Sequence, residues 1–296
     1  MMLAVSEPCD EKKVMAPSSK ESVVALPSGG EPVQAEVEYV LSEDLKDLTE
    51  VDCHLQTLVE RLESKEWLIV LEALTNVRQL AIFHTELMLP ILDKVVALVT
   101  KSMKNPRSAL CKTAIMSSAD IFKGYPEHLI DTLDPLLLQL LLKASQDKRF
   151  VCEEAEKSLE VMTTHMAPQP LLQKLQPYVK HFNPKVRAKA SVCFYNSASR
   201  LGSEGIEQIG LESLLQTAAA QLNDRLPEAR EAARKLLLHL HGVCSRNLPE
   251  VSLPEEVPTP DTEVTASKQG PWEQYCFKSL PAVTAQAVLR VTCVDS

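Results

Sequence analysis

The sequence has little glycine and few aromatic residues for its length. Of its 296 residues only eight are Gly, and only 4% are Phe, Trp or Tyr, whereas Leu, Val and Ala dominate an apolar fraction of 45%. A sheet protein of this size would carry more turn glycine and more β-branched and aromatic residues. The composition therefore excludes a large all-β architecture and favours helices.

Cysteine and histidine motifs are also missing. The eight cysteines stand alone, without a CxxC pair or a Cys/His cluster, which excludes a zinc knuckle and a dithiol redox motif. Scattered single cysteines at apolar helical positions are typical of small core residues in a reducing compartment. His239 and His241 are close in sequence but fall on different helix faces, so we expect no metal site.

Catalytic and nucleotide-binding motifs are absent as well. The sequence contains no GxSxG, Walker A, GxGxxG or HExxH pattern. Acidic pairs such as Glu153-Glu154 lie in early helical turns, where the helix dipole favours them. We therefore expect no enzyme, no catalytic residue and no cofactor.

No part of the chain has a large basic excess or a long apolar run. The formal charge is −9, of which residues 1–40 carry −4, residues 246–296 carry −3 and the remainder −2. Nucleic acid is therefore not an expected partner. The most apolar stretch, 133–142, is too short to cross a bilayer, and the N-terminus lacks a signal-peptide pattern. The sequence predicts a soluble, intracellular protein with no membrane partner.

Composition divides the chain into four parts. Residues 1–40 mix Pro, Ser, Gly and Glu with few large apolar residues and are predicted to be a disordered acidic segment. Residues 246–271 form a Pro/Glu-rich linker, and 272–296 form a short C-terminal amphipathic helix. Residues 41–245 are the predicted folded domain.

The predicted domain contains an internal sequence repeat. Five times a helical apolar pattern stops at a polar break and resumes as a second helix, with breaks centred near 65, 105, 147, 183 and 225. The spacings of 40, 42, 36 and 42 residues are typical of HEAT or armadillo repeats. The fold class predicted is all-α, an α-solenoid of five helix pairs.

Local signals support the helix boundaries. An apolar stripe from Leu45 to Leu62 predicts the first helix, and Asn105-Pro106 and Asn183-Pro184 each predict an Asn N-cap followed by Pro at the first helical position. Gly202 and Gly205 are predicted to interrupt the chain before the fifth repeat.

Because each break joins the two helices of one repeat, stacking should place all five breaks along one edge. Trp67 follows the first break directly; it is either partly buried packing or an interface anchor. Basic residues recur at or just after the other four breaks. A single such cation would be merely solvated, but cations at four successive breaks predict a basic stripe that binds an acidic partner.

At these residues the sequence resembles the TOG domain, a tubulin-binding HEAT module. It is similar to CLASP-like and crescerin-like members and to plant ARM-repeat/TOG proteins. The similarity lies in the segments that follow breaks two to five, namely 105–114, 148–155, 183–189 and 227–235. It covers roughly 45–242.

The resemblance implies a flat, non-enzymatic TOG paddle whose loop edge docks on a curved αβ-tubulin dimer and regulates microtubule dynamics or organisation in the cytoplasm and cytoskeleton. The tubulin-binding residues it implies are Lys65, Trp67, Asn105, Arg107, Ser108, Lys148, Arg149, Asn183, Lys185, Arg187, Arg225 and Arg230. One departure is Val70, which stands where the family often has Arg three residues after the Trp; Lys65 could substitute. A single module should bind weakly unless it self-associates or a partner recruits it.

Two alternatives stay open from the sequence. The domain could be a HEAT adaptor scaffold for a protein other than tubulin. The helix behind Pro281 could either pack back on the repeats as a cap or bind a partner.

Overall fold

The computed structural model describes residues 21–25, 33–37, 39–247 and 270–293. It divides into two compact units, residues 1–45 and residues 46–296. The predicted linker at 246–271 lies almost wholly outside the described residues, as do most of residues 1–40. The linker therefore stays a prediction.

The first unit contains a two-stranded antiparallel hairpin. Strand β1, Glu21–Ala25, pairs with β2, Val33–Val37, so that Glu21 lies opposite Val37. A short 3₁₀ helix, η1, follows at Ser42–Asp44. Here the structure differs from the predicted disorder of 1–40, because both segments contain valine, a strand-favouring residue.

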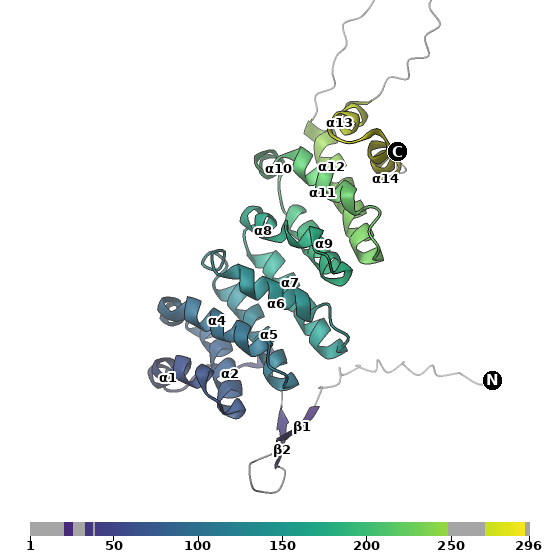
Figure 1. Ribbon diagram of the computed structural model, residues 1–296. Coiled ribbons are helices and arrows are strands. Elements are labelled where there is room, and N and C mark those ends of the chain that lie inside the picture. The colour runs from purple at the N-terminus through teal and green to yellow at the C-terminus, as the bar shows by residue number, and fades with distance from the viewer. Residues whose placement is uncertain (1–20, 26–32, 38, 248–269, 294–296) are drawn as a thin grey trace, which may run out of the picture. The chain divides into compact units, whose positions relative to one another are not determined.

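The second unit is all-α, as predicted, and its helix pairs follow one another along the chain (Figure 1). The pairs are α1 with α2, α4 with α5, α6 with α7, α8 with α9, and α11 with α12. Their bounds are α1 Val51–Glu63, α2 Trp67–Phe83, α4 Leu92–Met103, α5 Ser108–Gly124, α6 Leu133–Lys143, α7 Arg149–His165, α8 Pro168–Leu175, α9 Pro184–Ala198, α11 Leu211–Gln221 and α12 Pro227–Asn247. Short helices connect them: α3 Thr85–Met88, η2 Leu89–Ile91, η3 Tyr178–Lys180 and α10 Ser203–Ile209.

The second helices of the pairs form a continuous layer in which each helix packs on the next, in the order α2, α5, α7, α9, α12. Two hydrogen bonds join these helices near their middles. The Ser117 hydroxyl donates to the Leu74 carbonyl over 3.0 Å, and the hydroxyls of Ser118 and Ser158 lie 2.8 Å apart. Contacts at other heights show that α2 and α5 run parallel and nearly in step: Arg107 lies beside Trp67 where both helices begin, and Arg78 pairs with Asp120 further along both. Likewise Lys185 pairs with Asp147 where α9 and α7 begin, and Arg200 donates to the Thr163 carbonyl where they end. Their first turns therefore meet at one edge.

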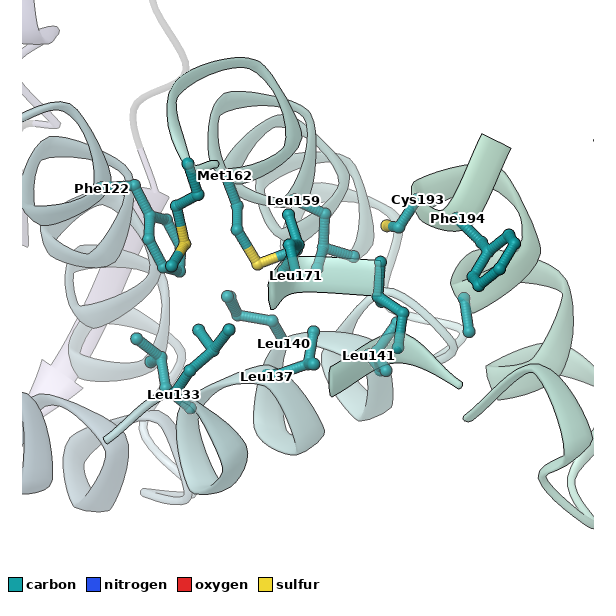
Figure 2. Packing of buried hydrophobic residues seen from close by; sticks show 14 of the residues in the cluster. Phe122, Leu133, Leu137, Leu140, Leu141, Leu159, Met162, Leu171, Cys193 and Phe194 are labelled. Atoms are coloured by element: carbon teal, nitrogen blue, oxygen red, sulfur yellow. The ribbon is translucent and has the colours of Figure 1, made fainter. Parts of the chain in front are cut away.

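The core is made of Leu, Met and small residues between the two helix layers. Figure 2 shows Phe122 of α5, Leu137 and Leu140 of α6 and Met162 of α7 directed into a shared interior, and all four are buried. The buried side chains from α1 to α14 form one connected hydrophobic cluster. Short helix pairs cannot bury both faces alone, so neighbouring repeats complete each other's core.

Two predicted boundaries were wrong. Helix α1 begins at Val51 and not at Leu45, because Glu50 adopts a left-handed backbone with φ of 54° that ends any helix before it. Gly202 interrupts the chain before α10, as predicted, but Gly205 lies inside α10; the interruption before α11 is Gly210, whose φ of 93° favours glycine.

The C-terminal region holds two helices where one was predicted, α13 at Pro271–Ser279 and α14 at Ala282–Thr292. Both pack on α12, and α14 also contacts α11. The Trp272 indole is buried and donates to the Thr292 hydroxyl over 3.0 Å. Val283, expected on the apolar face, is 81% exposed, because Ala285 and Val288 face the body instead. Of the two alternatives, the structure shows the cap.

Cysteine reactivity should follow this packing. Burial raises the pKa values of the Cys193 and Cys276 thiols to about 12, whereas Cys53 and Cys293 are exposed and not the core residues expected. At pH 8 a thiol with that pKa is ionised in about one molecule in 10,000. Among the cysteines of the described residues, we expect iodoacetamide to alkylate Cys53 and Cys293 first in the native chain, as read by mass spectrometry. Equally fast labelling of Cys193 would contradict the closed core; denatured chain is the control.

Candidate protein-binding edge

In each of the five repeats one turn separates the two helices, and we call these turns one to five in chain order. They are residues 64–66, 104–107, 144–148, 181–183 and 222–226. Each precedes a helix of the parallel layer described above, which brings the turns to one edge. The breaks predicted from sequence all fall within or at these turns.

Side chains shape four of the turns in the same way. Ser64, Asn105, Asn183 and Asp224 each accept a hydrogen bond from the backbone N–H two residues on, over 2.9–3.1 Å. This satisfies a backbone donor that the following helix cannot satisfy. Asn183 is the N-cap of α9, as predicted. The predicted start at Pro106 was wrong, because α5 begins at Ser108 with Arg107 at the N-cap.

Turns one and two meet through Trp67. The indole, at the first position of α2, is half-buried against the core, and the guanidinium of Arg107 lies 5.8 Å from its ring centroid. A cation at this distance over an indole is a favourable contact. Val70 is buried, so the arginine beside Trp67 comes from the next repeat and not from three residues further along. Lys65 is exposed on the same turn.

Turns three to five are tied by ion pairs. Lys185 lies 2.7 Å from Asp147, and this amine lowers the pKa of the Asp147 carboxyl. Arg187 donates to Asp224 and, over 2.7 Å, to the His181 carbonyl. Burial alone would raise the pKa of Asp224, but the bonds from Arg187 and the Leu226 amide lower it. These contacts fix the turns relative to one another.

The predicted site residues therefore differ in how available they are. Arg187 and Arg230 are partly buried, and Arg230 donates to the carbonyls of Asp224 and Arg225 over 2.8 and 3.0 Å, so both brace turn five. Asn105, Asn183 and Ser108 are half-buried. The predicted site residues that are exposed are Lys65, Arg107, Lys148, Arg149, Lys185 and Arg225. Arg149 is 89% exposed and paired with Glu153 over 2.7 Å.

Sequence reasoning missed Phe182. This ring, in turn four, is 89% exposed and lies 4.4 Å from the His181 ring. An exposed Phe between two polar turn residues is a candidate interface anchor. The sequence offered one signal, a large aromatic directly before the Asn-Pro that starts a helix.

Among residues 21–25, 33–37, 39–247 and 270–293, no group of three His, Cys, Asp or Glu side chains is arranged to hold a metal ion. In the same ranges, no helix combines the length and apolar character needed to cross a bilayer.

Comparison with known proteins identifies the domain. The family model described as CLASP N terminal matches residues 50–251. The mouse "TOG array regulator of axonemal microtubules protein 1" is 27% identical over 211 residues, 69% of this chain and 12% of the relative, and its human counterpart is 26% identical over 125 residues, 42% of this chain and 7% of the relative. The chain thus spans about an eighth or less of these relatives.

Solved structures show the same fold. The MAST/Orbit N-terminal domain superposes with a TM-score of 0.55 at 13% identity, covering 83% of this chain and 96% of that one. A crescerin TOG domain superposes with a TM-score of 0.55 at 16% identity, covering 81% of this chain and 90% of that one. The helix pairs, their turns and the family match agree: the chain belongs to the CLASP N-terminal family, and its helical unit has the TOG-domain fold.

Proposed function

We propose that this chain is a non-enzymatic microtubule-associated protein that binds αβ-tubulin through the edge formed by turns one to five. The observation that carries the proposal is the edge itself: an accessible indole at one end, exposed cations along it and an exposed Phe in turn four. The family and its named relatives, which regulate axonemal or ciliary microtubules, support tubulin as the partner.

Each part of the edge has a distinct role in this proposal. Trp67 and Phe182 insert into apolar sites on tubulin, because large rings exclude water at the centre of an interface. Lys65, Arg107, Lys148 and Lys185 bond acidic groups of tubulin, and their charges speed association. Arg187 and Arg230 act inside the protein by holding turn five in place. We place the activity in the cytoplasm, on microtubules or their ends.

Soluble tubulin tests the proposal directly. The full chain should co-migrate with αβ-tubulin on gel filtration, and the affinity should fall as salt is raised because exposed charges are screened. Trp67→Ala and Lys148→Ala/Arg149→Ala should each weaken binding by about 1–3 kcal/mol in a fluorescence titration.

A matched control separates the edge from overall charge. Lys123→Ala/Lys278→Ala removes the same charge from α5 and α13 away from the turns, where both side chains are exposed, and should leave binding unchanged. If tubulin bound every variant equally, the edge would have no part in the interaction. If tubulin failed to bind while another protein was retained, the chain would be a HEAT adaptor.

A further inference from the structure

A groove of about 570 Å³ lies between α7 and α9, on side chains other than those of the turns. Its apolar lining comes from Leu159, Val192 and Cys193; Leu159 and Cys193 are each 3% exposed, and Val192 is half-buried. This volume lies within the range of about 300–1,000 Å³ that is typical of ligand pockets. The groove is therefore large enough to bind part of a peptide.

Carboxylates dominate the rim. Glu153, Glu156 and Glu160 of α7 and Glu228 of α12 line the groove, together with only two amines, those of Lys157 and Lys189. An apolar floor with this rim favours a ligand that has cationic side chains around an apolar one, and it disfavours a phosphate or an acidic peptide.

The Lys189 amine offsets only part of this charge. Lys189 lies 2.7 Å from both Glu156 and Glu228, and these two carboxylates raise the pKa of its amine despite partial burial, which acts in the opposite direction. It joins α7, α9 and α12 into one surface, and the four carboxylates against two amines leave the groove with a net charge of −2. Within the described ranges Glu160 makes no ion pair, so its exposed carboxylate is available.

We propose that the α7–α9 groove binds a short basic segment of a partner protein. One apolar side chain of the segment lies on Leu159, Val192 and Cys193, and flanking Lys or Arg side chains bond Glu160 and the second carboxylate oxygens of Glu153 and Glu156, whose Oε1 atoms pair with Arg149 and Lys189. The groove lining contains none of the exposed turn residues proposed to contact tubulin, although Glu153 on its rim pairs with Arg149. A basic partner held here would give the chain a second attachment and raise its effective concentration at the partner's location.

The probe for this site is a fluorescein-labelled Lys-Arg-Leu-Lys-Arg peptide titrated with the full chain by fluorescence polarisation. It should bind, and Glu-Asp-Leu-Glu-Asp should not. Replacing the central Leu of the probe by Ser should weaken binding several-fold because the floor loses its apolar contact. Glu160→Lys should weaken binding by about tenfold, since it replaces an attraction by a repulsion.

Glu60→Lys is the matched control, because Glu60 is exposed on α1 in the first repeat and the substitution changes the net charge equally. It should leave probe affinity unchanged. Equal weakening by Glu60→Lys and Glu160→Lys would overturn the proposal in favour of nonspecific attraction to an acidic chain. So would equal binding of the Leu and Ser probes. Unchanged circular dichroism of both variants confirms that the fold is intact.

Discussion

Trp67→Ala/Phe182→Ala should weaken tubulin binding by about 2–4 kcal/mol, or about 30- to 1,000-fold. Trp67 directly follows turn one and Phe182 lies in turn four, three repeats apart, so their losses should nearly add. Phe182 is 89% exposed, and removing it alone should leave the free energy of unfolding unchanged. Isothermal titration with soluble tubulin measures the effect.

The control for this pair is Phe83→Ala/Leu87→Ala. Both side chains are 43% exposed, and Phe83 ends the helix that Trp67 begins, so they lie at the opposite edge. This variant removes a similar apolar area and should bind tubulin as the parent does. If the control lost as much affinity as the Trp67/Phe182 variant, the tubulin site would lie elsewhere.

Asp120→Ala should lower the free energy of unfolding by about 3–5 kcal/mol, because it leaves a buried cation without its carboxylate. Arg78 of α2 and Asp120 of α5 are 2% and 0% exposed, and Arg78 Nε lies 2.7 Å from Asp120 Oδ2. A domain's whole stability is about 5–15 kcal/mol, so this one change removes a large share. Urea unfolding followed by circular dichroism is the measurement.

A compensating variant tests the cause. Arg78→Met/Asp120→Leu removes both charges and fills the space with apolar groups, and it should recover most of the lost stability. A loss below about 1 kcal/mol for Asp120→Ala would show that water or other groups solvate Arg78 readily. Neither residue lies at the turns, so folded variants should keep their tubulin affinity.

Much of the fold was predictable because its signals are local. The apolar spacing of each helix and the polar breaks lie within about twenty residues, and they predicted the helix pairs and their turns correctly. The helix-starting signal at Asn183-Pro184 was correct for the same reason, since the Asn183 side chain bonds the backbone two residues on. Where a local signal was misleading, as at Leu45 and Gly205, a backbone angle of a nearby residue decided the boundary.

The sequence did not predict which individual side chains contact each other between neighbouring repeats. Trp67 meets Arg107, Arg78 meets Asp120, Ser118 meets Ser158 and Lys185 meets Asp147, and each pair is about one repeat apart in sequence. The period gives this separation but not which side chains meet, because that depends on the rotation of each helix against the next. The same rotation sends Arg187 inward to Asp224 and leaves Phe182 outward.

The sequence alone determined a chain of helix pairs about 40 residues apart, with tryptophan and cations at the turns, because helix formation and capping depend on residues a few positions apart. The tertiary structure decided which of those cations stay exposed, which carboxylates meet around the α7–α9 groove, and that the C-terminal helices cover α12. The physical reason is that burial and ion pairing arise only when one repeat packs on another and closes off water from the faces between them.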